Sequence, residues 1–405
     1  MTCLTPVIFG QQVLTWSQTK DRFRANNPTL LAGQVTIDES RAEEITAHLK
    51  PNPNINFGWD QLTPFNGNPY RPFSQSYLSW SIDYLHEREH KRELRLTSAQ
   101  KATAISMSAQ LDLERTLMFN LRDAFVRVMQ AKAVRGVAQE NLDYYDKEIS
   151  ISQARFKAGD ISQVDFQRVK LQRAQFASDL ETAGVNLRTA KIDLLTLLRD
   201  PVPLDQFDVS EPFDFDDSIT TPAALRTLAI NSRPDLQEAE RSLDKARIDH
   251  QLAIANGSAD PTFIVDASHQ LPPLNTYLGA SVSFPLRIFD RNQGNKLETL
   301  LDIGRNEKLR DAARLTALHD VDSAYATLES ALKLLHPYKA EYLDEAQNIR
   351  SAVSFAYLHG GASLLDFLDA QKEYRDTELS YLNLVGAYLS AANQLNFAVG
   401  REVIR

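Results

Sequence analysis

The sequence contains a single cysteine, Cys3, in a chain of 405 residues. One thiol excludes a disulfide framework and any zinc site built from cysteines. Long apolar runs are also missing: no stretch of about 18 or more consecutive apolar residues occurs, which excludes a transmembrane helix. Basic residues are fewer than acidic ones, 44 Lys+Arg against 53 Asp+Glu. The net charge of −9 argues against nucleic-acid binding, because phosphate contacts need a basic surface.

Proline is absent from three long stretches, residues 73–200, 286–336 and 338–405. A proline inside a helix costs about 3 kcal/mol, and these stretches are rich in good helix formers, so they predict very long helices. A helix over roughly 87–154 would extend on the order of 100 Å. Apolar residues at seven-residue spacing indicate coiled-coil-like packing. These residues are Leu180, Leu187, Leu194, Tyr381, Tyr388 and Leu395.

Two-residue alternation replaces the helical pattern in two segments that contain proline, 53–86 and 261–286. Each segment predicts a β-hairpin with one apolar face. Strands of about ten residues with aromatic residues on the apolar face are typical of transmembrane β-strands. The alternating apolar residues of the first hairpin are Ile55, Phe57, Trp59, Leu78, Trp80, Ile82 and Tyr84. Those of the second are Phe263, Val265, Ala267, Leu278, Ala280, Val282 and Phe284.

One glycine-containing stretch occurs twice, half a chain apart, as RFKAGDISQVDF (155–166) and AYLHGGASLLDF (356–367). Both copies predict a turn between two long helices, near 157–162 and 358–363, with glycines that allow a positive φ. These glycines are Gly159, Gly360 and Gly361. The other matched pairs are Ser162 with Ser363, Asp165 with Asp366 and Phe166 with Phe367.

The order helix, hairpin, very long helix, glycine turn and long helix therefore occurs twice. It predicts two structural repeats, 14–200 and 221–405, that form one domain. The prolines and acidic residues of 201–220 predict a connector between the repeats. Residues 1–13 are expected to be a signal-peptide remnant or a disordered terminus, and Cys3 is a weaker candidate for lipid attachment.

Four strands cannot close a barrel, and an open sheet edge is not tolerated in lipid. We therefore expect several copies of the chain to share one barrel, and three copies would give twelve strands. The same symmetry would gather the long helices into a tube. The predicted fold class is mainly α with membrane β: an antiparallel α-helical barrel protomer with four transmembrane strands, shared by a trimer.

The chain resembles the TolC-like family of outer-membrane efflux factors. LLDFLDAQKEYRDTE (364–378) is similar to the family's aperture-helix motif, and FPLRIFDRNQGN (284–295) to the strand-to-helix junction of the cobalt–zinc–cadmium type. NPTL (27–30) and RPDL (233–236) resemble the family's helix-start pattern. The resemblance implies an outer-membrane location in a diderm bacterium with a long periplasmic extension.

The resemblance also implies partners and cargo. A homotrimer would dock on a periplasmic adaptor (membrane fusion) protein and an inner-membrane pump of the resistance–nodulation–division type, and would contact outer-membrane lipid. The cargo would be heavy-metal cations or small toxic compounds. The chain carries no phosphate-binding loop, so we expect no cofactor and no enzyme activity, and energy would come from the pump.

Site residues follow from the same resemblance. Asp366 and Asp369 match the two acids of the aperture motif and share a helix face, and Asp165 repeats the first acid in the other half. Six carboxylates around a tunnel mouth would raise one another's pKa, attract cations and narrow the pore. The expected adaptor contacts are Gly159, Asp160, Ser162, Gly360, Gly361 and Ser363. The expected membrane-interface aromatics are Trp59, Trp80 and Tyr84.

Two alternatives from other classes remain open at this point. An elongated soluble coiled-coil scaffold would explain the helices but not the apolar hairpins. A zinc-dependent hydrolase is suggested by HEREH (86–90), an H-E-x-x-H match with His86 and His90 as weak metal candidates and Glu87 as general base. The motif lies where a strand gives way to a helix, and no third ligand can be named.

Overall fold

A computed structural model describes residues 12–62, 65, 69, 72, 73, 76–216, 219–270 and 275–404. Cys3 and its predicted lipid attachment, with most of the expected signal remnant, lie outside these residues. The first half contains β1 (Gln12–Leu14), α1 (Trp16–Asn26), α2 (Pro28–His48), β2 (Asn54–Asp60), β3 (Tyr77–Leu85), α3 (Lys91–Ala158) and α4 (Gln163–Leu198). The 3₁₀ turn η1 (Leu204–Gln206) and β4 (Phe207–Val209) follow.

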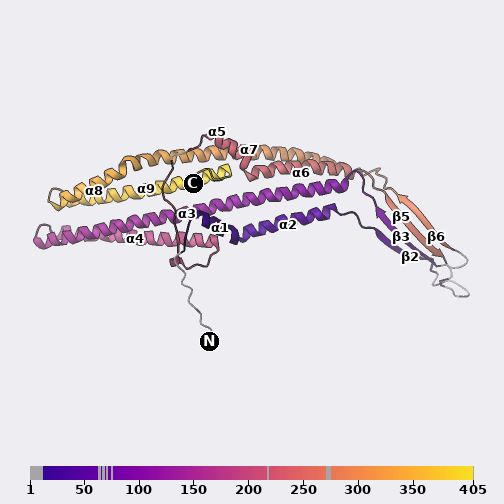
Figure 1. Cartoon of the computed structure of the whole chain (residues 1–405), viewed down its shortest axis with the longest axis horizontal. Helices are drawn as coiled ribbons and strands as arrows, with labels where there is room; N and C mark the ends of the chain where they lie inside the picture. Colours follow the sequence, from indigo (N-terminus) through magenta and orange to yellow (C-terminus); the bar gives the residue numbers. More distant parts are fainter. Residues whose placement is uncertain are drawn as a thin grey trace, which may run out of the picture. The chain divides into compact units, whose positions relative to one another are not determined.

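The second half contains α5 (Pro222–Ser232), α6 (Pro234–Asn256), β5 (Thr262–Gln270), β6 (Thr276–Ser283), α7 (Gln293–Pro337), the π-helical segment η2 (Tyr338–Tyr342), α8 (Leu343–Leu358) and α9 (Leu364–Val399) (Figure 1). The predicted mainly helical fold with four strands in two hairpins is confirmed. Pro28 and Pro234 each occupy the first position of a helix, where the missing N–H costs nothing.

Helix α3 is 68 residues long, or about 100 Å. It begins and ends about four residues later than predicted. Glu89 and His90 have positive φ, 55° and 54°, so the helix cannot start before Lys91. Gly159, with φ 86°, ends it. Over the described ranges, none of the helices has both the length and the apolar content that a bilayer crossing needs.

The corresponding helix of the second half is interrupted. Pro337 stands at the end of α7, and the five residues after it form the π-helical segment η2 before α8 continues. Because proline has no N–H and its ring clashes with the preceding turn, the local hydrogen-bond pattern must change there. The first half has no proline between 73 and 200, and α3 is continuous.

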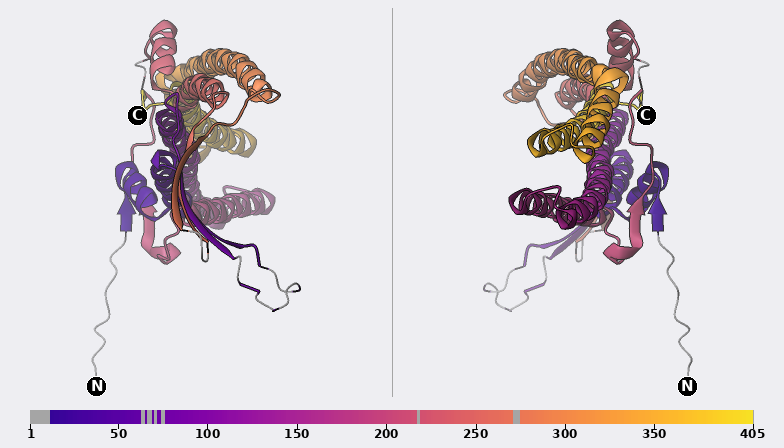
Figure 2. Two further views of the ribbon diagram at one scale, coloured as in Figure 1. Left: turned by 90° about the vertical axis from the view of Figure 1, so that its right-hand side faces the viewer. Right: turned by 90° about the vertical axis from the view of Figure 1, so that its left-hand side faces the viewer.

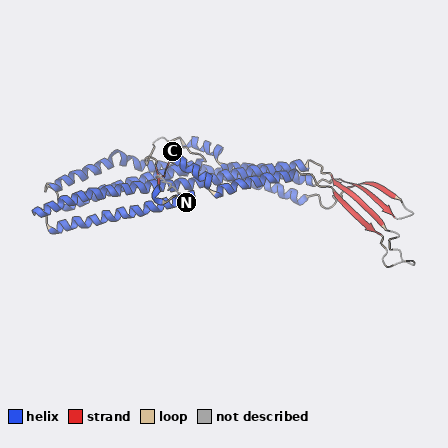
Figure 3. Ribbon diagram, turned by 60° about the horizontal axis from the view of Figure 1, so that its bottom comes forward, coloured by secondary structure: helices blue, strands red, loops and turns tan. Residues whose placement is uncertain are grey.

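The chain divides into two compact units. One comprises Met1–Ala32, Gln110–Pro234 and Arg314–Arg405, and the other Gly33–Ala109 and Asp235–Ala313. Each unit combines segments of both predicted repeats. The first unit holds the helical core and both glycine turns, and the second holds the four-stranded sheet, drawn as red arrows in Figure 3.

The first unit has two apolar cores. The larger includes the fully buried Phe125, Val321 and Leu395, and the smaller, close to the glycine turns, includes Tyr145 and Phe367. The predicted heptad residues face these cores. Leu194, Tyr388 and Leu395 are buried, and Leu180, Leu187 and Tyr381 pack against the buried clusters.

A small parallel sheet in the first unit is not predicted by the sequence. Strand β1 pairs with β4 through Gln12–Phe207, Val13–Asp208 and Leu14–Val209, and Figure 2 shows the indigo β1 beside the pink β4. Three-residue strands are too short to give an alternation signal. The acidic connector thus contains a strand, whose Asp208 forms ion pairs with Lys132 and Lys191.

The C-terminal end of α9 is capped by side chains that are distant in sequence. Arg115 donates to Phe397 O at 2.8 Å, Ser232 to Val399 O at 2.7 Å and Arg233 to Ala398 O at 3.2 Å. The last carbonyls of a helix have no partner within it, and they carry the negative end of its dipole. Two guanidinium groups therefore stabilise this end both as donors and as charges.

We predict that Gly400→Ala destabilises the protein more than Gly159→Ala. Both glycines have positive φ, 82° and 86°, which costs a residue with a Cβ about 1–2 kcal/mol. A Cβ at Gly400 would also lie 3.1 Å from Arg233 Cα, whereas a Cβ at Gly159 meets no atom within 4 Å. Thermal unfolding of both variants tests this order, and equal shifts in Tm would contradict the crowding at Gly400.

Candidate functional site

The first candidate region is the sheet of the second unit, with strand order β2-β3-β5-β6. All neighbouring pairs are antiparallel, and the two hairpins join through β3 and β5. In the register, Phe57 faces Trp80 and Trp80 faces Ala267, which in turn faces Leu278. The next row on this face is Ile55, Ile82, Val265 and Ala280. One face of the sheet is therefore continuously apolar across four strands.

The opposite face is polar. Its central row is Asn56, Ser81, Asp266 and Gly279. Asn56 donates to Ser81 Oγ at 3.2 Å and to Asp83 Oδ2 at 2.6 Å. Gly279 leaves room for the Asp266 side chain, because a Cβ there would lie 2.7 Å from both carboxylate oxygens.

The apolar face is open to its surroundings. Phe57 is 78% exposed and Leu278 81% exposed. Monomeric soluble proteins rarely expose contiguous apolar patches of this kind, whereas lipid-facing strands alternate apolar outward and polar inward residues. In the described part of the chain, β2 and β6 have a partner strand on one side only.

The base of the sheet is held by a buried ion pair. Lys91, whose side chain is 4% exposed, donates to Asp260 Oδ2 at 2.6 Å and to Ser258 O at 3.0 Å. The backbone N–H of Arg88 donates to the other Asp260 oxygen at 2.9 Å. This group fixes the start of α3 against the loop before β5.

The FPLRIFDRNQGN junction has a structural role that the sequence did not reveal. Asn292, with φ 62°, donates to Ala253 O at 2.7 Å and joins the start of α7 to the end of α6. Its N–H donates to Asp290, and that of Arg291 donates to Gln293. The polar residues of the motif thus shape the turn.

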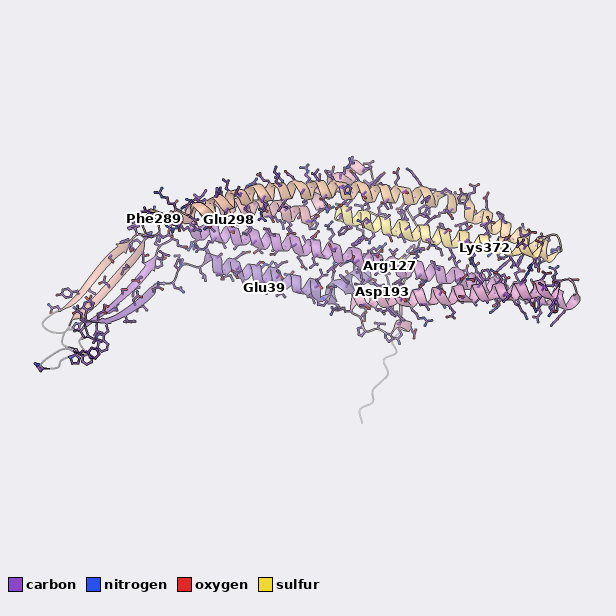
Figure 4. All side chains as sticks on the ribbon, turned by 180° about the vertical axis from the view of Figure 1, so that it is seen from behind. Glu39, Arg127, Asp193, Phe289, Glu298 and Lys372 are labelled. Carbon is purple, nitrogen blue, oxygen red and sulfur yellow. The ribbon has the colours of Figure 1, made fainter. Side chains whose placement is uncertain are left out.

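The apolar residues of the same junction are exposed and were missed as site candidates. Leu286 is 81% and Phe289 90% exposed, and Phe284 and Ile288 are more than half exposed. Figure 4 shows Phe289 on the loop between β6 and α7. The signal in the sequence was the F-x-L-x-I-F spacing beside a strand end.

The three expected interface aromatics lie on the apolar side of the first hairpin. Trp59 is one residue from the outer end of β2 and stacks on Phe73 with ring centroids 5.6 Å apart. Tyr84 is one residue from the opposite end of the hairpin, on β3. Trp80 lies between these ends and faces Phe57. The residues are therefore at three different heights along the strands.

The HEREH segment does not have the geometry of a zinc hydrolase. That geometry needs both histidines on one helix face, but α3 begins only at Lys91, and His90 is in a turn with positive φ. Glu87 is held by the Arg95 guanidinium, so it is not free to act as a base. Among the residues with assigned positions, His, Cys, Asp and Glu form no group of three that could hold a metal ion.

The second candidate region is the pair of helical tips in the first unit. Gly159 and Gly360 have the predicted positive φ, 86° and 74°, but Gly361 does not. The prediction for Gly361 is wrong because a single left-handed residue already completes the turn, and the Gly361 N–H then donates to Ala356 O at 2.7 Å. The six predicted adaptor contacts are all exposed.

Serines cap the helices that follow both turns. Ser162 accepts from the Asp165 N–H at 3.1 Å, and Ser363 accepts from the Asp366 N–H at 3.2 Å. In the second tip, the Ser363 N–H also donates to Asp366 Oδ2 at 3.0 Å, which completes a capping box. Ser162 and Ser363 are therefore the N-cap residues of α4 and α9, and the Asp366 side chain completes the second cap.

Within one chain, hydrogen bonds to Ser363 determine the electrostatics of Asp366. Hydrogen bonds from the Ser363 side chain and backbone lower the pKa of Asp366 within the chain. The cap that the Asp366 carboxylate provides is thus fully present above the ordinary pKa of 3.8. It is lost as the pH falls through the lowered pKa of this group.

Asp369 lies one turn further along α9, exposed to solvent. It lines a surface hollow of about 410 Å³ together with Glu373, Asp376 and Lys372. Sequence reasoning grouped Asp369 with Asp366, but the structure gives the two carboxylates different surroundings.

We predict that Asp260→Asn lowers the free energy of unfolding by about 3 kcal/mol, because it leaves the Lys91 ammonium buried without its counter-charge. Asp244→Asn is the matched control, since Asp244 also pairs with an α3 lysine, Lys101, at 3.1 Å but with both side chains more than a third exposed. That change should cost under about 1 kcal/mol. Denaturant unfolding measures both, and equal effects would contradict the importance of burial.

Known proteins share sequence and fold with this chain. Residues 225–401 match the family model described as "Outer membrane efflux protein". The chain is 24% identical over 330 residues to the cobalt-zinc-cadmium resistance protein CzcC of Cupriavidus metallidurans, covering 77% of this chain and 74% of CzcC. It is also 24% identical over 323 residues to the pyoverdine export outer membrane protein OpmQ of Pseudomonas aeruginosa, covering 76% of this chain and 66% of OpmQ.

A crystal structure of CusC superposes with a TM-score of 0.78 and 17% identity, covering 99% of both chains. The two relatives are named for metal resistance and for pyoverdine export, and neither name describes an enzyme. Residues 225–401 are thus similar in sequence to outer membrane efflux proteins, and the chain as a whole has the fold of CusC.

Proposed function

We propose that this outer-membrane protein is the channel component of a tripartite exporter. Three copies would share one twelve-stranded barrel, and the tips would contact a periplasmic adaptor that links the channel to an inner-membrane pump. Transport through the channel is passive, and the chain performs no chemistry of its own.

The observation that carries this proposal is the four-stranded sheet. It has one continuous apolar face and two edges without a partner strand in the described chain. Each unpaired backbone group in hydrocarbon costs several kcal/mol, so such a sheet enters a bilayer only when its edges are paired. Antiparallel pairing of β6 of one copy with β2 of the next would close the ring, because both are edge strands of the same sheet.

The exposed apolar junction residues support the same placement. Leu286, Ile288 and Phe289 lie between the sheet and α7, beside Arg287 and Arg291. Apolar and basic side chains together suit the boundary between acyl chains and headgroups. The long helices would then begin at the membrane surface.

The tips supply the periplasmic mouth in this proposal. Asp369, Glu373 and Asp376 line one surface hollow on α9, and threefold symmetry would repeat that acidic surface. An acidic mouth favours cations. The relatives are named for cobalt-zinc-cadmium resistance and for pyoverdine export, and we infer metal cations as the cargo class because of the acidic mouth.

The membrane assignment predicts opposite outcomes for two adjacent residues. Ile82 lies on the apolar face opposite Ile55 and Val265, and Ser81 on the polar face opposite Asn56 and Asp266. Ile82→Arg should lose about 2–4 kcal/mol of insertion free energy near the bilayer centre. Ser81→Arg should be tolerated, because it faces carboxylates.

The measurement is the mass of the detergent-extracted particle from outer membranes. Wild type and Ser81→Arg should give a trimer, and Ile82→Arg little or none. A monomer that needs no detergent would support the soluble scaffold and end the channel proposal. Equal trimer yields from both arginine variants would contradict the assignment of the faces.

Substitutions of Asp369 and Asp366 should affect different properties of the protein. Asp369→Ala should lower the cation preference of single-channel currents in planar bilayers and leave amide exchange at the tip unchanged. Asp366→Ala removes the partner of Ser363 and should speed amide exchange over the first turn of α9. If Asp366→Ala changes ion preference and leaves exchange unaltered, the capping role assigned to Asp366 is wrong.

A further inference from the structure

Four buried oxygen atoms near the helical tips have no hydrogen-bond partner within the described chain: Tyr145 Oη, Glu148 Oε2, Ser152 Oγ and Tyr357 Oη. Their residues are at most 7% exposed. Tyr145, Glu148 and Ser152 are three and four residues apart on α3, so they share one helix face. Tyr357 comes from α8.

These groups lie close enough to act on one another. Glu148 raises the pKa of both the Tyr145 and Tyr357 hydroxyls, in each case after the larger effect of burial. Ser152 lies beside Tyr357 without meeting the geometry of a hydrogen bond, and it lowers the pKa of that hydroxyl. The cluster therefore contains one carboxyl group and three hydroxyl groups.

No cation forms an ion pair with Glu148 among the residues that have assigned positions. The Arg155 guanidinium lies over the Tyr357 ring at 5.1 Å and donates to Tyr357 O at 2.8 Å. Asp165 of α4 also acts on Tyr357 and adds negative charge. A buried carboxylate without a counter-charge is expensive, so the neutral form is favoured.

The neighbours on α4 and α9 are aromatic rings, and the Arg350 guanidinium of α8 is a further cation, placed over the ring of Tyr144. Phe176 of α4 and Phe367 of α9 pack on the Tyr145 ring, with centroids 4.8 and 6.4 Å away. The Tyr144 hydroxyl is the one polar group that lowers the pKa of Glu148. Apolar rings thus surround the site on the sides formed by α4 and α9.

We propose that the Glu148 carboxyl group is a proton-binding site buried between α3 and α8, and that its ionisation weakens the packing of these two helices near the tips. The ligand is a proton. The proposal goes beyond the channel function and does not depend on it, because it concerns the packing within one chain.

Three polar or charged contacts between α3 and α8 would loosen. Tyr144 Oη donates to Ser354 Oγ at 3.0 Å, Arg155 bonds to Tyr357 O, and the Arg350 guanidinium lies over the Tyr144 ring at 4.5 Å. Ionised Glu148 needs water, and water can reach it when α8 separates from α3. A polar contact of this kind can open locally without loss of the whole fold.

The direction of the pH effect follows from the sign of the shift. Burial raises the pKa of Glu148 above its ordinary value of 4.5. The contribution of protonated Glu148 to the packing of α3 and α8 is therefore complete below the ordinary pKa, and it is lost as the pH rises through the raised pKa. Burial also raises the pKa of Glu378 on α9. Ionisation of Glu378 would change stability with pH in the same direction as that of Glu148, so a separate Glu378 variant is needed.

The test is amide hydrogen exchange of the full-length protein over residues 350–358 between pH 5 and pH 8, corrected for the intrinsic exchange rate. Glu148→Gln mimics the protonated group at every pH. Glu140→Gln makes the same chemical change on α3 at an exposed position. Glu378→Gln measures the second acid, and Glu148→Met serves if the glutamine variant folds poorly.

For each variant we divide its amide protection factor over residues 350–358 by that of wild type at the same pH. For Glu148→Gln we expect this ratio to be at least about threefold higher at pH 8 than at pH 5. The ratio for Glu140→Gln should stay constant. A pH-independent ratio for Glu148→Gln, or the same pH dependence in Glu140→Gln, would overturn the proposal. A ratio that follows sodium concentration and not pH would also overturn it, because the site would then hold a metal cation.

Discussion

Backbone hydrogen bonding at the edges of one small sheet is the constraint on which the rest of this structure depends. Strands β2 and β6 each have one partner within the described chain. In water their free edges could bond to solvent, but in lipid they cannot. The proposed trimer satisfies both edges with identical copies. Since α3 follows β3 and α7 follows β6 in the sequence, closure of the proposed ring would also determine where the long helices begin.

The two halves of the chain are duplicated in order but are not independent folding modules. The central pair of the sheet, β3 with β5, joins one half to the other. The halves have also diverged at matched positions. Ser363 and Asp366 form a complete capping box, whereas Ser162 and Asp165 form part of one. Pro337 adds a π-helical segment on one side only.

Much of this architecture was predictable because it follows from periodic patterns. Absence of proline identified the helices, and two-residue alternation identified both hairpins. The remaining features depend on contacts between distant residues. Nothing local in the sequence marks Arg115 as the cap of α9, or Glu148 as a buried carboxyl group without a cation. The predictions for HEREH and Gly361 were wrong for a related reason. Both depend on backbone conformation, namely the positive φ of Glu89 and His90 before Lys91 and that of Gly360 before Gly361.

The cap on α9 also has a consequence for folding. Arg115 and Phe397 are 282 residues apart in the sequence, and the other two capping side chains, Ser232 and Arg233, lie well over 150 residues before the carbonyls they contact. A contact of such high sequence separation closes a very long loop, which slows folding. The first unit cannot complete its core until almost the whole chain is available for folding. Until then, the incomplete chain must be kept from aggregating.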